Sequence, residues 1–317
     1  MKWKKLGQIF DFNKSSFKDK FISHSQSPQA LVFKNFVRIY FSTRKKSENR
    51  KFLSYIQYVD FDKSFSKIIN QSNHEVLALG NLGSFDEHGI FPMNPIKVKN
   101  KIYAYTSGWT RRVSVDVDSG IGLVVSKNGG ETFRRIGAGP VLTSSLYEPF
   151  LVIDGFVKRF DDIFHMWYIY GTDWKIYHEN KNPERTYVIG HAISHNGIDW
   201  KKENRQIIES KYKGECQALP TVIKKEDRYH MYFCHRNSYD FRNNPKKSYK
   251  LGYAYSDDLL NWIRDDSLSG IDVSENSWDS DMMCYPNLFV CFNEFYLLYN
   301  GNDFGKNGFG LAKLIED

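Results

Sequence analysis

The chain has 317 residues and a formal net charge of +7, from 44 basic and 37 acidic side chains, and 16% of its residues are aromatic. Its lysines are scattered instead of forming a dense basic stripe with interleaved aromatics, which excludes an ordinary nucleic-acid-binding surface. No apolar run is long enough to cross a bilayer, and residues 1–7 lack the apolar core of a secretory signal. We therefore expect a cytoplasmic protein without a transmembrane segment.

Short strands rich in aromatic residues recur along the chain. Five are expected, at 37–41, 101–105, 164–168, 229–233 and 294–299. Each follows a run led by a proline, at a similar offset in the last four cases; in chain order these are Pro28, Pro95, Pro149, Pro220 and Pro286. A strand, a tight turn and an aromatic strand, repeated in this way, are typical of an all-β fold.

A second repeat follows three of the aromatic strands. It predicts a strand, a polar turn and then an aromatic residue, and its copies lie at 121–130, 189–197 and 251–258. Their turn serines, Ser126, Ser194 and Ser256, are 68 and 62 residues apart. The aromatic residues after the turns are Phe133, Trp200 and Trp262. A strand period of this length is typical of β-propeller blades.

We predict one all-β domain over residues 1–317, a five-bladed β-propeller of four-stranded antiparallel blades. The blades are expected roughly at 20–70, 85–136, 145–205, 215–266 and 280–317. Whether the N-terminal segment completes a blade stays open. The loops of a propeller converge at one end of its axis, so polar groups far apart in sequence can meet there.

Carboxylates that precede the innermost strands are the first candidates for a site. They are Asp86, Glu148, Glu215, Asp279 and Asp281. Four successive blades thus supply acids at equivalent places. Carboxylates held in one pocket move each other's pKa values apart, which provides a proton donor and a base. The alternative is that each acid is a solvated or turn-capping residue.

A second set of candidates lies beside these acids or at the ends of the aromatic strands, facing the cavity or its rim. Its members are Arg44, His88, Trp109, Asp173, Trp174, His235, Arg236, Asn300 and Asn302. Aromatic faces stack on sugar rings, and guanidinium or amide groups bond to hydroxyl, carboxylate or phosphate. The alternative is that the tryptophans are core residues and the arginines pair locally with the acids.

No motif predicts a metal ion or a cofactor. The four cysteines show no Cys-x-x-Cys pairing, and the nine histidines show no pair at metal-ligand spacing. We expect no cofactor. His24 and His88 are the candidates for holding a cation or a water at the axis.

Several segments resemble a known group of proteins. Residues 256–262, Ser-Asp-Asp-Leu-Leu-Asn-Trp, resemble a turn of five-bladed propeller glycosidases, the arabinanase, xylosidase and invertase group. Residues 126–133 are similar to the Asp-box turn of sialidases, with Asn128 in place of Asp. The chain resembles more closely, over nearly all its length, a family of glycosidase-like propeller proteins encoded among bacterial surface-polysaccharide genes. The matching segments are 38–44, 85–89, 229–233 with Arg236, 278–280 with 285–286, and 299–302 with 308–312.

This resemblance implies a carbohydrate-active enzyme of bacterial surface-glycan metabolism, such as that of lipopolysaccharide or capsule. It would cleave or transfer a glycosidic or glycosyl-phosphate bond by carboxylate acid–base catalysis. By blade order, the resemblance makes Asp86 the base or nucleophile, Glu148 the residue that tunes it, and Glu215 the acid. The expected partner is a sugar, a glycan or a nucleotide-sugar, and the basic surplus favours an acidic or phosphorylated one.

Other interpretations of the sequence stay open. Hydrolase, transferase and phosphorylase are not distinguished, and neither the sugar nor the oligomeric state follows from the residues. A propeller that binds a glycan or sugar nucleotide without catalysis is a second interpretation, and a protein–protein scaffold is a third. The scaffold predicts an open lysine-rich face and no cavity lined by acids.

Overall fold

The computed structural model describes residues 1–47, 51–178 and 182–316, and most of its regular structure is β-strand. The strands form three four-stranded sheets and one of eight strands. In the eight-stranded sheet, one parallel pair, Ser54 with Gly89, joins two antiparallel groups of four. The described strands therefore divide into five groups of four, which we call blades 1 to 5.

The blades have the following strands, given from the inside outward. Blade 1 contains β2 (Ser23–Val32), β3 (Val37–Lys46), β4 (Phe52–Phe61) and β5 (Ile68–Gln71). Blade 2 contains β6 (Gly89–Val98), β7 (Lys101–Arg111), β8 (Val117–Ser126) and β9 (Arg134–Arg135). Blade 3 contains β10 (Phe150–Phe160), β11 (Ile163–Lys175), β12 (Glu184–Ser194) and β13 (Lys201–Lys202). Blade 4 contains β14 (Glu215–Lys225), β15 (Arg228–Asn237), β16 (Lys250–Ser256) and β17 (Ile263–Arg264). Blade 5 contains β18 (Cys284–Cys291), β19 (Glu294–Asn300), β20 (Gly308–Glu316) and β1 (Lys2–Asp11).

The remaining helical elements are short. The α-helix α1 spans Asn302–Gly305, and single 3-10 turns lie at Phe12–Lys14, Ser16–Asp19, Pro245–Lys247 and Asp266–Ser269. In the part of the chain that the structure describes, no helix is long and apolar enough to cross a membrane.

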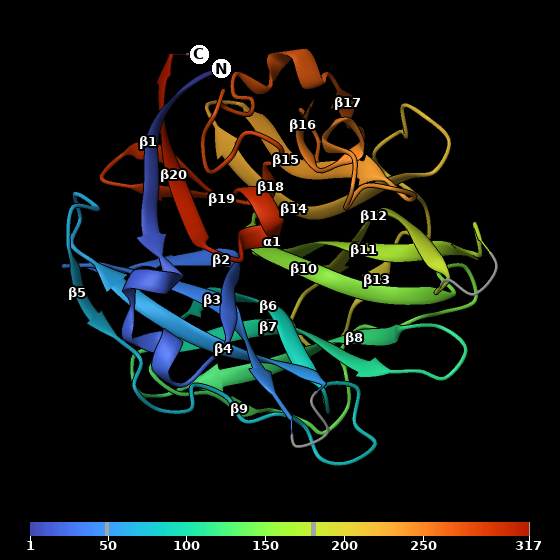
Figure 1. Cartoon of the computed structure of the whole chain (residues 1–317), viewed down its shortest axis with the longest axis horizontal. Coiled ribbons are helices and arrows are strands. Elements are labelled where there is room, and N and C mark those ends of the chain that lie inside the picture. Colours follow the sequence, from blue (N-terminus) through green and yellow to red (C-terminus); the bar gives the residue numbers. More distant parts are fainter. Residues whose placement is uncertain (48–50, 179–181, 317) are drawn as a thin grey trace.

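The innermost strands surround a common axis. Each of β2, β6, β10, β14 and β18 contacts the next, and β18 contacts β2, so the ring is closed. Figure 1 shows the blades arranged radially around this centre, with β1 and β20 side by side near both ends of the chain. The predicted all-β propeller of four-stranded antiparallel blades is thus confirmed.

The polar turns repeat at the level of single hydrogen bonds. Ser126 Oγ accepts from the backbone N–H groups of Asn128 and Gly130. Ser194 Oγ accepts from Asn196 and Gly197, and Ser256 Oγ from Asp258 and Leu259. A serine hydroxyl that satisfies two turn N–H groups fixes the chain reversal after β8, β12 and β16.

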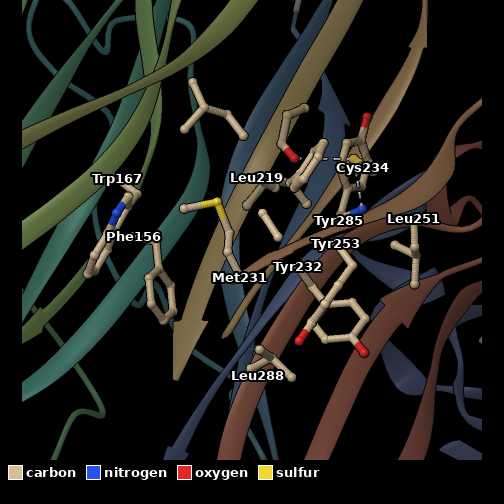
Figure 2. Packing of buried hydrophobic residues seen from close by; sticks show 14 of the residues in the cluster. Phe156, Trp167, Leu219, Met231, Tyr232, Cys234, Leu251, Tyr253, Tyr285 and Leu288 are labelled. Atoms are coloured by element: carbon tan, nitrogen blue, oxygen red, sulfur yellow. Dashed lines mark hydrogen bonds between the residues drawn. The ribbon is translucent and has the colours of Figure 1, made fainter. Parts of the chain in front are cut away.

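Large side chains fill the space between the blades. In Figure 2, Trp167 and Phe156 of blade 3 lie beside Met231 of blade 4, and Tyr232 and Leu288 continue the cluster into blade 5. Trp167, Met231 and Tyr232 are completely buried. All four cysteines are free and buried.

Each innermost strand has a register shift against its hairpin partner. At these shifts six residues have positive φ, namely His24, Ser27, Leu151, Asp154, Leu219 and Tyr285. Bulges of this kind bend a strand and redirect a side chain, and they are common next to functional sites. Here they lie where the strands pass closest to the axis.

Candidate functional site

A cavity of about 580 Å³ opens among the five blades. Its volume is in the range of pockets that enclose small ligands. The innermost strands contribute His24, Gln26, Phe91, Leu151, Ile153, Asp154, Ala218 and Tyr285. The neighbouring strands and loops contribute Arg44, Phe52, Ser54, Trp109, Asp116, Val117, Ile169, Arg185, Tyr187, Arg236, Phe241, Arg242, Tyr249 and Phe304. Polar groups from all blades therefore meet at one place, as a propeller allows.

Asp154 is the buried carboxylate of this cavity and is 4% exposed. Its backbone has φ of 62° at the bulge of β10, a conformation that Asp tolerates better than most residues. Its N–H donates to Ser107 Oγ at 2.9 Å, and its Oδ2 accepts from the Leu219 N–H at 3.2 Å. Within the described residues Oδ1 has no hydrogen-bond partner. One carboxylate oxygen is thus left for a ligand.

Burial raises the pKa of Asp154 to about 7, although the Leu219 N–H and the nearby charge of Arg185 act in the opposite direction. Desolvation penalises the ionised form of a carboxyl group, so this side chain holds its proton up to neutral pH. A carboxyl group with such a pKa can donate a proton at physiological pH.

Arg236 is a buried cation in the cavity wall, 3% exposed. Its guanidinium lies 3.5 Å from the ring centre of Phe241 and about 5 Å from those of Tyr187 and Tyr249. It donates to the Asn237 carbonyl at 2.7 Å, and no carboxylate within the described residues pairs with it. Aromatic rings thus hold a positive charge in place without neutralising it.

Three further arginines line the same cavity. Arg242 pairs with Glu184 at 3.0 Å. For Arg44 and Arg185, the described part of the chain supplies no ion-pair partner, and each guanidinium lies over an aromatic ring instead, that of Phe52 or Trp174. Burial and the charge of Arg242 lower the pKa of Arg44. The cavity therefore concentrates positive charge.

Apart from the exposed Asp116, the remaining walls are aromatic or uncharged. Trp109 lies against Gly89, where a Cβ would collide with the indole, so glycine is required for this ring position. The hydroxyls of Tyr187 and Tyr249 are 2.5 Å apart. His24 is neutral, because burial and the nearby Arg44 lower its pKa to about 3.

The acids expected to be catalytic lie elsewhere. Asp86, Glu148 and Glu215 are buried but do not line the cavity. Each forms an ion pair with a cation on the outermost strand of its own blade: Asp86 with Arg135 of β9, Glu148 with Lys202 of β13 and Glu215 with Arg264 of β17. Asp279 pairs in the same way with Lys5 of β1, at 2.6 Å. The equivalent placement is real, but it ties inner to outer strands instead of bringing the acids together.

All four carboxylates also accept hydrogen bonds from neighbouring groups, Asp86 from the Ser84 hydroxyl at 3.2 Å and Asp279 from the Tyr299 hydroxyl at 3.3 Å. Glu148 Oε1 accepts from the Tyr168 hydroxyl at 2.7 Å. Glu215 accepts from Arg264 at 2.5 Å, from the Lys211 N–H at 2.7 Å and from Gln217 at 3.2 Å. Asp86, Glu148 and Glu215 therefore lie in three separate ion pairs and not in the wall of this cavity.

Some residues of the second predicted set line the cavity, and others do not. Arg44, Trp109 and Arg236 line the cavity. His88 stacks behind Trp109 at 6.0 Å, and Trp174 stacks on Arg185, so both support residues of the wall. His235 belongs to the network around Glu215 and Asp266.

The other members of that set, and one of the acids, lie outside the cavity wall. Asp173 and Asp281 are exposed. Asn300 bonds to the backbone of Ser25, Ser27 and Gly308, and Asn302 to that of residues 277, 281 and 282. Asn300 thus bonds to backbone groups of blades 1 and 5, and Asn302 to backbone groups of the loop that precedes β18.

Sequence reasoning missed Asp154, and two features could have revealed it. It is an acid inside an apolar run, Leu-Val-Ile-Asp-Gly-Phe-Val, at 151–157. In addition, Phe156 pairs with Trp167 as Thr221 pairs with Tyr232, so Asp154 corresponds to Leu219 of blade 4. Alignment by proline obscured this, because Pro149 precedes β10 while Pro220 lies inside β14. Arg185 and Tyr187 lie on β12, a strand for which no site was predicted.

In the part of the chain that the structure describes, no group of three His, Cys, Asp or Glu side chains is arranged to hold a metal ion. No protein-family model matches the chain.

Comparison with known proteins finds a relative that is similar in sequence and solved structures that are similar in fold. The chain is 31% identical over 316 residues to the uncharacterised protein Rv1502 of Mycobacterium tuberculosis (strain ATCC 25618 / H37Rv), and the match covers 99% of both chains. A solved complex of BT0996 with RGII superposes with a TM-score of 0.74 at 14% identity, over 98% of this chain and 91% of that one. A thermostable family-43 glycoside hydrolase superposes with a TM-score of 0.67 at 16% identity, over 93% and 91%. At these identities the two structures establish the propeller fold.

Proposed function

The chain belongs to one family with the mycobacterial protein Rv1502 and has the propeller fold of family-43 glycoside hydrolases, and on this basis we propose that it is a carbohydrate-active enzyme. It would act on a glycosidic or glycosyl-phosphate bond, with Asp154 as the proton donor. The observation that carries this proposal is the buried carboxyl group of Asp154, with a pKa of about 7 and one unpartnered oxygen among the described residues, in a cavity of ligand size.

The chemistry follows from the protonation state of Asp154. As the bond between the anomeric carbon and the leaving oxygen breaks, that oxygen takes the proton from the carboxyl group, and Asp154 becomes a carboxylate. The acceptor, which is water, a hydroxyl or phosphate, forms the new bond to the anomeric carbon. The nearby Arg185 stabilises the carboxylate that results. Asp116, the other carboxylate of the cavity wall, is the candidate base for the acceptor.

Other wall residues suit a sugar ring. The indole of Trp109 offers a flat apolar face, and the guanidinium of Arg44 offers donors for hydroxyls. The resemblance to proteins encoded among surface-polysaccharide genes supports a bacterial surface glycan, or its precursor, as the substrate.

The test compares leaving groups. We expect Asp154→Asn to lower kcat by about 10²- to 10⁴-fold on glycans with a sugar leaving group, because an alkoxide must be protonated. With 4-nitrophenyl glycosides the loss should be much smaller, because nitrophenolate leaves without a proton. Rates are measured on a panel that includes arabinofuranosides and xylosides, with Asp227→Asn, an exposed carboxylate, as the matched control. Equal losses on both substrate classes would exclude Asp154 as the acid.

A second candidate is a propeller that binds sugars without catalysis. One observation favours it: the positions equivalent to Asp154 in three other blades hold Ser27, Leu219 and Tyr285, so the innermost strands supply a single carboxylate to the cavity wall among the described residues. This alternative predicts that Asp154→Asn binds the same ligands as the wild type. It also predicts that the wild type turns over none of the panel.

A further inference from the structure

The arginines of the cavity carry an inference that rests on the proposed function and names its substrate class. Arg44, Arg185 and Arg236 face the cavity without a carboxylate partner within the described residues, while Arg242 is paired with Glu184. Against these three cations the cavity wall offers two carboxylates: Asp154, whose pKa of about 7 leaves it about half protonated at neutral pH, and the exposed Asp116. The cavity is therefore positively charged.

Such an arrangement is costly without a ligand. A buried cation that lacks an anionic partner carries a large desolvation penalty. Arg236 is 3% exposed, and its Nε has no hydrogen-bond partner among the described residues. Its guanidinium is held between Phe241, Tyr187 and Tyr249, so its position is fixed before a ligand arrives. The charge that completes this site must come from the ligand.

The amount of charge distinguishes phosphate from carboxylate. A uronic acid brings one negative charge, which would leave two of the three arginines without an anion. A phosphate monoester brings close to two, and a diphosphate brings two or three, with oxygens for several guanidinium groups. Arginine also matches the bidentate geometry of phosphate oxygens.

We propose that Arg44, Arg185 and Arg236 form a phosphate subsite, so that the ligand is a phosphorylated sugar, either a glycosyl phosphate or a sugar diphosphate. In this proposal the phosphate binds these arginines, and the sugar contacts Asp154 and Trp109, which line the same cavity. The two kinds of ligand differ in the number of phosphate groups: a glycosyl phosphate has one and a sugar diphosphate has two.

Binding is measured by calorimetry at pH 7 with inorganic phosphate, pyrophosphate and galacturonate. We expect phosphate or pyrophosphate to bind at least tenfold more tightly than galacturonate. Tighter binding of pyrophosphate than of phosphate would assign the ligand to the sugar diphosphates, and the reverse order to the glycosyl phosphates. Galacturonate that binds as tightly as both, or no binding of either phosphate, would overturn the proposal.

Variants locate the subsite. Arg44→Gln removes a cation that has no ion-pair partner among the described residues, so the protein should fold, and phosphate affinity should fall by about 10- to 100-fold. Arg159→Gln, which removes an exposed arginine paired with Asp162, is the control for the same change of net charge and should bind like the wild type. Equal affinities of the two variants would contradict the subsite. Asp154→Asn should keep its phosphate affinity, so a failure of the proposed catalytic role would leave this result intact.

Discussion

The buried charged residues of this propeller lie in two regions that differ in how the charges are paired. In the blades, Asp86, Glu148, Glu215 and Asp279 each have a cation partner on the outermost strand of the same blade. In the cavity, Arg44, Arg185 and Arg236 have no such partner within the described residues, and Asp154 has one free oxygen. The first arrangement recurs from blade to blade, and the second occurs once.

This difference separates structure from function. Each blade must join its inner strand to its outer strand in the same way. A residue type found at equivalent places in several blades is therefore explained by packing within the blade. A ligand is bound only once, on the axis, and its site needs different groups from each blade. Recurrence of the acids therefore indicated a structural role, although it had suggested a shared site.

The largest effect should come from breaking a blade ion pair. Glu215→Gln leaves Arg264, whose side chain is 4% exposed, with less compensation, and removing one member of a buried pair costs about 3–5 kcal/mol. Urea unfolding measures this loss, with Glu226→Gln, an exposed residue, as the control. An unchanged free energy of unfolding together with abolished turnover would restore Glu215 as a catalytic residue.

Asp154→Asn should instead raise the free energy of unfolding at high pH. The pKa of Asp154 is about 7 in the folded protein and about 4 in the unfolded chain, so the folded state binds more protons between these values. Wild-type stability from this group is therefore full below pH 4 and declines as the pH rises to about 7. The amide of Asn does not ionise, so the variant does not lose this stability as the pH rises.

We expect Asp154→Asn to exceed the wild type in stability by up to about 4 kcal/mol at pH 8, with the difference shrinking towards pH 4. Thermal unfolding at several pH values measures it. A difference that is constant with pH would show that the carboxyl group does not titrate in this range, and the distinction between the two regions would weaken.

A smaller loss of stability is expected for the ion pair of Lys5 with Asp279, because its cation is partly exposed to solvent. The side chain of Lys5 is 23% exposed, while that of Asp279 is 1% exposed and also accepts from the Tyr299 hydroxyl at 3.3 Å. Water can partly replace the ammonium group, so Lys5→Met should cost about 1–3 kcal/mol. Chemical denaturation tests this, and a cost equal to that of Glu215→Gln would show that exposure does not grade the ion pairs.

The smallest effect is expected outside both regions. Asp173 is exposed and makes no side-chain contact among the described residues that would stabilise the fold. Asp173→Ala should change stability by less than about 0.5 kcal/mol and leave phosphate affinity unchanged. A clear loss of affinity in the calorimetric assay would extend the site to the end of β11.

Much of the fold was predictable because it depends on local patterns. Aromatic strands and Ser-led turns recur with the blade, and each turn serine accepts hydrogen bonds from two backbone N–H groups of its turn. The site depends on long-range geometry instead. Arg44, Trp109 and Arg236 were found because they end the aromatic strands, a rule that holds in any blade.

Asp154 could not be placed by the same rule. Its position depends on a bulge that shifts β10 against β11, and a register shift of this kind leaves no fixed mark in the sequence. Arg185 and Tyr187 reach the cavity from β12, which the repeat alone describes as a blade strand like any other.

The pairing of β1 with β20 has a consequence for how the protein is made. Residues 2–11 bond to residues 308–316, so the last blade is assembled from segments about three hundred positions apart. During synthesis the first strand must stay unpaired until the final one leaves the ribosome, and contacts of such separation form slowly. A chain shortened at either of these strands lacks part of the outer half of blade 5, which supports β18, the strand that completes the ring around the axis. Such a chain should fail to gather its arginines around a ligand.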